Sequence, residues 1–298
     1  MITRTRARLT TAGGLAVALA LLAAARPRAQ SPSADSVTFV GAGDIAVCSN
    51  MAPVRATAKL LDAIEGTVFT LGDHAYKHGD ANEFRDCYGS TWGKHKARTR
   101  PTIGNHDLIT GKGRPYFDYF GDSAGPDRRG YYSFDLGAWH LVSLNSSVQM
   151  KPDSAQVKWL RQDLAEHPNA CVLAYWHAPL FSSSVAGDKA LADVWKVLYD
   201  ACVDVVLNAH AHAYERFAPQ DDQGRPDPAR GIREFIVGTG GGTLDGLKQS
   251  APNSEIYNDK TYGVLKMTLS AHSYAWEFVP IAGQRFRDGG TAQCSPAR

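Results

Sequence analysis

The sequence lacks an apolar run long enough to cross a bilayer, because the stretch Leu15–Ala25 falls well short of the ~20 residues that a spanning helix needs. Three arginines precede it within the first eight residues, and small residues suited to cleavage follow near Ala25 and Ala29. We therefore expect residues 1–29 to be a cleaved secretory signal peptide rather than a retained membrane anchor. No adjacent arginine pair in this leader indicates the twin-arginine route. The mature protein is expected to be secreted or periplasmic, with no membrane attachment.

An excess of positive charge is also missing once the leader is set aside. The full chain has 32 Lys and Arg against 30 Asp and Glu, a formal net charge of +2. Residues 1–29 contain five arginines and no acidic residue, so the remainder has 27 basic and 30 acidic residues and a formal net charge of −3. This balance gives no support for specific nucleic-acid binding or for binding to a membrane surface.

Cysteine pairs with zinc-finger spacing are absent. The chain has five cysteines, an odd number, so at least one thiol is free or pairs with another chain. Disulfides persist in exported proteins, and Cys48 and Cys87 each lie a short loop beyond the end of an expected strand, which makes a bridge between them plausible. Cys171 and Cys202 each begin an apolar strand, which fits buried small apolar residues at least as well as disulfides.

Strands and helices are expected to alternate beyond a polar linker at residues 30–36. The expected strands are Val37–Gly41, Val68–Leu71, Cys171–Trp176, Val203–Leu207 and Glu234–Gly238, with antiparallel pairs at Tyr131–Leu136 with Trp139–Leu144 and at Tyr262–Leu269 with Tyr274–Pro280. The expected helices are Pro53–Ile64, Asn82–Tyr88, Ser154–Glu166 and Asp188–Cys202. Internal repeats and extended low-complexity tracts are absent.

The early strands are continuous apolar runs, typical of buried parallel strands, whereas the later ones alternate as half-exposed antiparallel strands do. This pattern predicts an α/β (α+β, mixed-sheet) fold: a four-layer αββα sandwich of two mixed β-sheets flanked by helices. We expect a single domain over residues 37–290, followed by a C-terminal tail at 291–298. The segments 111–130, 182–190, 219–231 and 243–260 are predicted to be loops that border a substrate cleft.

Polar residues follow five of the apolar runs. They are Asp44 after Phe39–Gly43, Asp73 and Tyr76 after Val68–Gly72, Asn105-His106-Asp107 after Pro101–Gly104, His177 after Val172–Trp176, and His210 with His212 after Val205–Ala209. Because parallel strands bring their carboxyl ends to one edge of a sheet, these side chains are expected to share one crevice.

Each of these clusters alone has a plain structural interpretation, since an Asp after a strand often caps a turn and a single His is often a core residue. Together they bring carboxylates, imidazoles, an amide and a phenol into one place, and burying such groups is costly without partners. Carboxylate and imidazole are ligands for Zn, Fe and Mn. A carboxylate shared by two ions ~3.5–4 Å apart is the arrangement of two-metal hydrolytic sites.

At these residues the chain resembles the calcineurin-like metallophosphoesterases. The blocks are Gly43-Asp44, Gly72-Asp73-His74-Ala75-Tyr76, Gly104-Asn105-His106-Asp107, His177 and His210-Ala211-His212-Ala213-Tyr214-Glu215-Arg216. The spacing from Asp73 to Tyr76 and the run from His212 to Arg216 are similar to the purple-acid-phosphatase branch. The resemblance covers nearly the whole mature chain.

The resemblance implies a centre of two metal ions. Asp44, Asp73, Tyr76 and His212 would hold the first ion, and Asp73 would bridge to the second, which Asn105, His177 and His210 would complete. A tyrosine ligand implies Fe(III), with Fe, Zn or Mn as its partner. His106 would stabilise the transition state or protonate the leaving oxygen, and Asp107 would orient His106.

The activity implied is hydrolysis of small-molecule phosphomonoesters by attack of a metal-bound hydroxide. A phosphodiesterase or nucleotidase on the same site, and a non-catalytic phosphate-binding or cell-surface interaction protein of the same fold, remain alternatives. The sequence does not specify the oligomeric state.

Three positions depart from the family pattern, namely Ala209 where glycine is usual, Ala178 where a second histidine is common, and Ala211 where a polar residue is common. No histidine lies between residues 178 and 209, so the leaving-group histidines of the plant branch have no counterpart there. In addition, Ala46 stands where the wider family has a histidine, and Tyr76 supplies the alternative ligand.

Four other features receive structural interpretations. The run Gly238–Gly242 lacks the Lys-Ser/Thr of a phosphate loop and is interpreted as a strand exit near the cleft. The aromatic residues at 116–120 are interpreted as a packed loop anchor, and Ser182–Ser184 as cleft lining. His74 and His78 lie near the crevice, where each is as readily a solvated loop residue as a participant.

Overall fold

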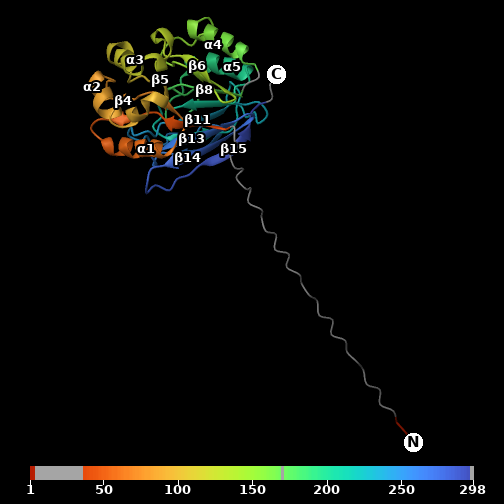
Figure 1. Cartoon of the computed structure of the whole chain (residues 1–298). Helices are drawn as coiled ribbons and strands as arrows, with labels where there is room; N and C mark the ends of the chain where they lie inside the picture. Colours follow the sequence, from red (N-terminus) through yellow and green to blue (C-terminus); the bar gives the residue numbers. More distant parts are fainter. Residues whose placement is uncertain (4–35, 169–170, 296–298) are drawn as a thin grey trace. The chain divides into compact units, whose positions relative to one another are not determined.

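The computed structural model describes residues 1–3, 36–168 and 171–295 (Figure 1). The expected signal peptide and linker lie almost entirely outside the described residues, as do the last three residues of the chain. In the part of the chain that is described, no helix is both long enough and apolar enough to span a membrane.

Two mixed sheets form the centre of the fold, as predicted. The first has the order β15-β14-β13-β1-β3-β5, formed by Gly289–Gln293, Ser273–Pro280, Gly263–Ser270, Val37–Ala42, Thr67–Leu71 and Thr99–Thr102. The second has the order β12-β10-β11-β9-β8-β7-β6, formed by Ser254–Asn258, Tyr214–Phe217, Arg233–Val237, Val205–Asn208, Cys171–Tyr175, Trp139–Ser143 and Tyr132–Leu136. A third, two-stranded sheet pairs β2, Ala46–Val47, with β4, Ala75–Tyr76.

Parallel pairing occupies one end of the six-stranded sheet and the middle of the seven-stranded sheet. In the first sheet β1, β3 and β5 are parallel, and in the second β7, β8, β9 and β11 are parallel. The antiparallel strands lie on one side of them in the first sheet and on both sides in the second. The carboxyl ends of the parallel strands are the ends at which the sequence places its polar clusters.

The α-helices are α1 Met51–Ala63, α2 Ala81–Glu83, α3 Arg114–Phe120, α4 Ala155–Glu166 and α5 Ala192–Asp200; a π-helix spans Phe84–Tyr88, and 3₁₀ segments span Trp92–Arg98, Gly111–Gly113, Gly121–Ala124, Pro126–Arg128 and Lys189–Leu191. Helices α4 and α5 lie on the outer side of the seven-stranded sheet, and α1 lies against the six-stranded sheet beside β13 (Figure 1). The Ser154 side chain caps α4 by accepting a hydrogen bond from the Val157 N–H at 3.3 Å, as its position in the sequence predicts.

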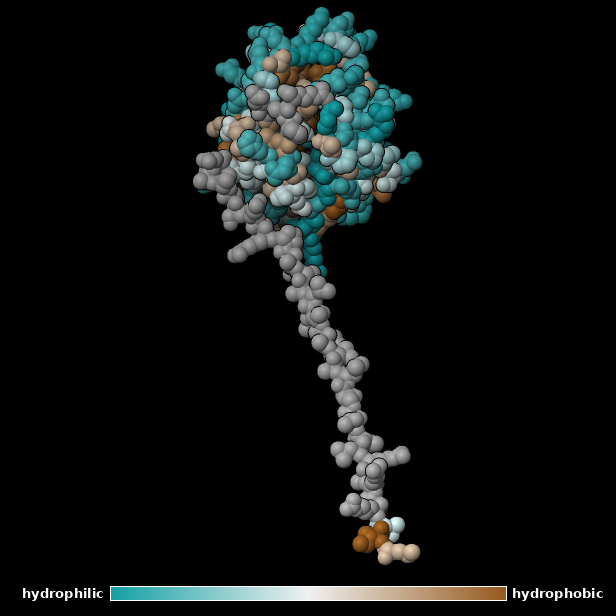
Figure 2. Space-filling model, turned by 90° about the vertical axis from the view of Figure 1, so that its right-hand side faces the viewer, coloured by the Kyte–Doolittle hydropathy of each residue, from teal (hydrophilic) through white to brown (hydrophobic). Residues whose placement is uncertain are grey.

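The main core lies between the two sheets, where side chains such as Phe39, Phe69, Tyr175, Leu207 and Phe235 are fully buried. A second core lies between the seven-stranded sheet and helices α4 and α5. The face on the side of α5 and β15 is largely hydrophilic, with hydrophobic residues in small separate areas (Figure 2). Most of the large apolar side chains are therefore buried between the layers, where they hold the sheets and helices together.

Several segments differ from the sequence-based expectation. Residues 111–130, expected to be a loop, contain α3, whose Tyr116, Phe117 and Phe120 are buried at helical spacing. Residues 243–260 contain the edge strand β12. The expected tail begins too early, because β15 continues its pairing with β14 to Gln293. β15 consists of small and polar residues, so it has no apolar pattern to reveal it.

Two disulfides lie in the described structure. The Cys48–Cys87 bridge is present as the sequence suggests. The interpretation of Cys171 as a small apolar residue was incomplete, because it is bonded to Cys294 and ties the start of β8 to the end of the described chain. Cys202 is the one free thiol among the described cysteines, and it is half-buried.

Candidate metal centre

Seven side chains, six of them following strands of the two large sheets and one in the two-stranded sheet, meet at the carboxyl ends of the parallel strands. Asp44, Asp73 and Asn105 follow β1, β3 and β5, and Tyr76 lies in β4. His177 follows β8, and His210 and His212 follow β9. One ligand atom from each of Asp44, Asp73 and His177 lies within 4.8 Å of the others. The structure thus brings together all seven residues that the sequence nominates as metal ligands.

The backbone bends sharply to aim these side chains. Asp44, Asp73 and His210 adopt left-handed φ values of 56°, 51° and 66°, which residues other than glycine rarely adopt. Such strain persists where the surrounding structure holds it, and it clusters at functional sites. The β2–β4 pair adds a second restraint, because it fixes Tyr76 beside Val47.

Two glycines leave the space that the carboxylates occupy. A Cβ at Gly104 would collide with the Asp73 carboxylate, and a Cβ at Gly238 would lie 2.5 Å from Oδ2 of Asp44. Gly240 donates its N–H to the carbonyl of Gly43 at 2.9 Å. The run that begins at Gly238 is therefore a wall of the candidate metal centre, a role that its sequence did not reveal because it resembles a flexible strand exit.

Asp44, Asp73, Tyr76 and His212 form one half of the centre. The Tyr76 hydroxyl lies 2.8 Å from Asp44 Oδ1, 3.1 Å from Asp73 Oδ2 and 3.1 Å from His212 Nε2. His212 Nε2 lies 3.4 Å from Asp44 Oδ1. Four donor atoms therefore face a common point.

The other half is formed around His177. Its Nε2 lies 2.9 Å from Asn105 Oδ1, 3.4 Å from Asp73 Oδ2 and 3.2 Å from His210 Nδ1. Asp73 Oδ2 is thus close to Tyr76 in one half and to His177 in the other. It is the oxygen placed to be shared.

The orientation of two imidazoles leaves lone pairs directed at oxygen atoms. His177 Nδ1 lies 2.7 Å from the carbonyl oxygen of Leu71, and His212 Nδ1 lies 2.7 Å from that of Thr243. Each Nδ1–H therefore donates to the backbone, so in the neutral ring Nε2 is an acceptor. Both Nε2 atoms face carboxylate oxygens, which are also acceptors. A proton or a metal cation between each Nε2 and the carboxylate oxygen is needed to remove the repulsion between these acceptors.

The nearby carboxylates also hold protons on these two rings. Burial lowers the pKa of His177 and of His212, but the nearby carboxylates outweigh it and raise the two pKa values to about 9 and about 10. Asp73 is the main partner of His177, and Asp44 of His212. Burial and the positive charge of His177 lower the pKa of His210.

The acidic groups respond in the complementary direction. Burial raises the pKa of Asp44, but His212 and His177 outweigh it and hold that pKa well below its usual range. The pKa of Asp73 is also lowered, with His177 opposing the effect of burial. Burial, together with Asp44 and Asp73, raises the pKa of Tyr76 well above its usual value. The carboxylates are ionised and call for positive charge.

The donor set fits two metal ions. Oxygen and imidazole donors meet in two groups that share Asp73, and the Nδ1 bonds to backbone carbonyls are the outer contacts that orient histidine ligands in metal sites. Bound cations would replace the protons that His177 and His212 otherwise retain.

His106 stands at the rim of this centre. The backbone N–H of His106 donates to Asp73 Oδ1 at 2.8 Å. Its ring Nδ1 lies 2.6 Å from the carbonyl oxygen of Lys77. That bond leaves Nε2 directed toward the centre, 4.0 Å from Asp73 Oδ2. The side chain is 32% exposed, so it can reach a molecule bound above the two half-sites.

Asp107 does not orient His106, which corrects the role expected from the resemblance. Its carboxylate accepts hydrogen bonds from the backbone N–H groups of Asp73, His74 and Gly104 and from His74 Nδ1, at 2.9–3.0 Å. It is fully buried. Asp107 therefore ties together the loops that carry Asp73 and Asn105.

His74 and His78 also have different environments. His74 is fully buried, with Nε2 2.7 Å from Thr70 Oγ1 and its ring among Phe84, Tyr88, Tyr116 and Phe120. It is a core residue, which the neighbouring polar sequence hides. The His78 side chain is 62% exposed and has the solvated position considered for it.

Two of the departures from the family pattern are accommodated without strain. Ala209 is buried and has no positive φ, because the left-handed turn falls one residue later, at His210. Ala178 is half-buried and donates its N–H to Ser146 Oγ at 3.3 Å. A hydroxyl-bearing loop after β7 thus lies beside Ala178.

Comparison with known proteins agrees with this geometry. The family model described as "Calcineurin-like phosphoesterase" matches residues 37–214. The chain belongs to the calcineurin-like phosphoesterase family. This phosphoesterase chain is 26% identical to purple acid phosphatase 18 of Arabidopsis thaliana over 84% of its own length and 60% of the relative's. It is 29% identical to probable purple acid phosphatase 20 of the same plant, over 83% of its own length and 62% of the relative's length.

Among solved structures, purple acid phosphatase PPD1 from yellow lupin, Lupinus luteus, matches with a TM-score of 0.68 and 19% identity, over 87% of this phosphoesterase and 54% of the lupin chain. This likeness confirms the fold. The chain spans about three fifths of the length of the two Arabidopsis relatives. The predicted resemblance to the purple-acid-phosphatase branch is confirmed.

Proposed function

We propose that this protein is an exported phosphatase that hydrolyses phosphomonoesters of small molecules at a centre of two metal ions. The observation that carries the proposal is the pair of donor groups that share Asp73 Oδ2. The purple acid phosphatases among its relatives support the same reaction class. The two ions, when bound, would supply Lewis acidity for activating water and for neutralising charge on the phosphoryl oxygens.

The side chains of this chain divide the remaining tasks. Asp44, Tyr76 and His212 would hold one ion and Asn105, His177 and His210 the other, with Asp73 between them. With both ring nitrogens protonated, His106 would donate a proton or hydrogen bond to the ester through Nε2, because its Nδ1–H is engaged by the carbonyl oxygen of Lys77. Its exposed edge is the side from which a substrate would enter.

We propose Fe(III) in the half that contains Tyr76, with Fe, Zn or Mn in the other half. Burial and two adjacent carboxylates raise the pKa of the Tyr76 phenol, so it ionises only against a strongly polarising cation. Tyr76→Phe is expected to remove any visible charge-transfer band while leaving the fold intact. A band that survives in the absorption spectrum of the variant would show that the phenol is not an iron ligand.

Export is supported by the leader-like sequence of residues 1–29 and by two disulfides, since disulfides persist in oxidising compartments. N-terminal sequencing of the protein recovered outside the cytoplasm tests this proposal. Cleavage near Ala25 or Ala29 is expected, and an intact leader would contradict it.

The reaction itself is tested by elemental analysis of the purified protein together with a substrate panel. We expect two metal ions per chain and faster turnover of p-nitrophenyl phosphate than of its bis ester or of cyclic nucleotides. Faster turnover of the diesters would favour a phosphodiesterase. Two bound metals without hydrolysis of any ester would favour a phosphate-binding protein.

A further inference from the structure

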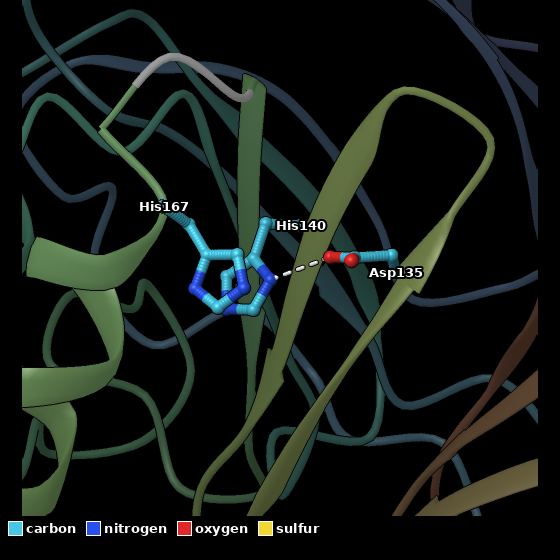
Figure 3. Close-up of side chains that lie close together, drawn as sticks. All are labelled: Asp135, His140 and His167. Atoms are coloured by element: carbon cyan, nitrogen blue, oxygen red, sulfur yellow. Dashed lines mark hydrogen bonds and ion pairs between the residues drawn. The ribbon is translucent and has the colours of Figure 1, made fainter.

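A second group of imidazoles and carboxylates lies in the seven-stranded sheet. Figure 3 shows Asp135 from β6, His140 from β7 and His167 just after α4, with their side chains directed toward one another. One ligand atom from each lies within 4.8 Å of the others. We call these three residues, together with Asp163 of α4, the His140 cluster.

His140 is held between two carboxylates. Its Nδ1 lies 2.8 Å from Asp135 Oδ1, and its Nε2 lies 2.8 Å from Asp163 Oδ2. Asp135 is its direct cross-strand partner, and the imidazole is 1% exposed. A histidine with one nitrogen toward a ligand position and the other donating to a buried carboxylate is the arrangement in which outer carboxylates orient metal-bound imidazoles.

His167 presents a free nitrogen to the same place. Its Nδ1 lies 2.8 Å from the carbonyl oxygen of Asp163, so Nδ1–H donates and Nε2 is an acceptor in the neutral ring. The His140 and His167 rings are stacked, with centroids 3.6 Å apart and planes 13° from parallel (Figure 3). His167 follows the last turn of α4 and is half-buried.

The cluster opens to solvent through a pocket of about 310 Å³. The pocket is lined by Asp135, Glu166 and His167 and by the hairpin turn at residues 137–139. Asp135 is 66% exposed. A small ion and its water ligands therefore have a path to Asp135 and His167, and Glu166 is an additional carboxylate beside that path.

This pocket is distinct from the candidate metal centre. His140 lies near the amino end of β7, and β7 runs parallel to β8, whose carboxyl end leads to His177. The cluster is therefore at the opposite end of the sheet from the phosphoesterase site. None of its members is a residue that the sequence analysis nominates.

We propose that the His140 cluster is a third metal site, for a divalent transition-metal ion such as Zn²⁺. His140, through the nitrogen now bonded to Asp135, His167 through Nε2 and the Asp135 carboxylate would be the ligands, with solvent or Glu166 completing four-coordination. Asp163 is a positioning residue that accepts the remaining N–H of His140.

Binding requires two local changes. The proton that His140 shares with Asp135 leaves to solvent, and the metal takes its place, so no electron transfer or bond cleavage is involved. The His167 ring rotates out of the stack, because a metal ligand lies in the plane of its imidazole. The fold is otherwise unchanged, since β6, β7 and α4 already hold the three ligands together.

The test is titration of the full-length protein, with its catalytic metals in place, with Zn²⁺ alone. We expect one additional zinc ion per chain after gel filtration, with no change in the original metals, and release of about one proton. His167→Ala and Asp135→Asn are each expected to weaken zinc binding at least about tenfold, and Asp163→Asn by about 10–100-fold.

His95→Ala is the matched control, because His95 also pairs with a carboxylate, Asp62, at 3.0 Å, but has no second imidazole beside it. It should bind zinc as the wild type does. Hydrolysis of p-nitrophenyl phosphate should be unchanged in all four variants, which shows that they are folded. Failure of the wild type to retain the additional zinc, or equal zinc binding by wild type and His167→Ala, would overturn the proposal.

Discussion

The candidate metal centre and the His140 cluster place the same residue types together by different means. In the centre, His177 and His212 donate Nδ1–H to backbone carbonyls and turn Nε2 toward carboxylates. In the cluster, His140 bonds with carboxylates at both nitrogens. The first arrangement leaves several acceptors facing one another, whereas the second is satisfied when both nitrogens of His140 carry a proton. Strong metal binding is therefore expected where several hydrogen-bond acceptors face one another without donors. The presence of histidine and aspartate side chains alone is not enough.

The backbone is strained in the candidate metal centre and regular in the His140 cluster. Three residues of the centre have left-handed φ values, whereas Asp135 and His140 are an ordinary cross-strand pair in a hairpin. Strain maintained at strand ends is characteristic of sites selected for function. We therefore expect the centre to bind its ions more tightly than the His140 cluster binds its added zinc.

The largest expected effect separates the two regions directly. Asp73→Ala removes the oxygen shared by both halves of the centre, so both original metals should be lost and phosphoester hydrolysis should fall by at least about 10³-fold. Zinc binding at the His140 cluster should survive, because none of its ligands is altered. Elemental analysis and turnover of p-nitrophenyl phosphate measure both. Retention of both original metals would remove Asp73 from its bridging role.

A smaller effect is expected at the rim of the centre. His106→Ala should lower kcat by about 10²-fold or more, as expected for loss of a proton donor, while the bound metals remain. His78→Ala is the control, since His78 lies on the same loop as Lys77 but is solvated. If both variants have the same kcat as the wild type, His106 takes no part in the reaction.

The smallest effect concerns pH and stability in the His140 cluster. Burial lowers the pKa of His140, but hydrogen bonds to Asp163 and Asp135 raise it overall above its usual value. The stabilisation from the protonated ring is therefore fully present below the unfolded pKa of about 6.5 and is lost as pH rises through the folded pKa. The difference in unfolding free energy between wild type and His140→Gln should shrink as pH rises from 6 to 9.

For His95→Gln, the difference in unfolding free energy from the wild type is expected to change with pH in the opposite direction. Burial and Arg98 lower the pKa of His95, so any stability that it contributes is lost as pH falls rather than as it rises. Urea unfolding without added zinc, at several pH values, measures both differences. A His140→Gln difference that is constant with pH would show that the ring is not protonated in the fold.

The central strands and the ligand positions could be predicted because both depend on local sequence. An apolar run followed by a polar residue, such as Val68–Leu71 before Asp73, predicts where a buried strand ends. It also predicts which side chain lies at that end. The structure places all seven nominated ligands together for this reason. The resemblance to phosphoesterases then gave their expected roles.

The parts that sequence could not predict depend on partners far apart in the chain. The acceptors of Asp107 are filled by His74 and by backbone N–H groups, so its proximity to His106 in sequence was misleading. The bond between Cys171 and Cys294 joins residues 123 positions apart. His140 and His167 meet only because α4 packs across β7, and neither residue stands in a recognisable motif.

X-ray diffraction from crystals of the purified protein, recorded at the absorption edges of its metals, tests the central claim most directly. Two anomalous peaks are predicted on either side of Asp73 Oδ2, one within ligand distance of Tyr76 and His212 and the other within ligand distance of Asn105 and His177. A crystal that shows a single peak, or none, between those side chains would contradict the assignment of a two-metal centre.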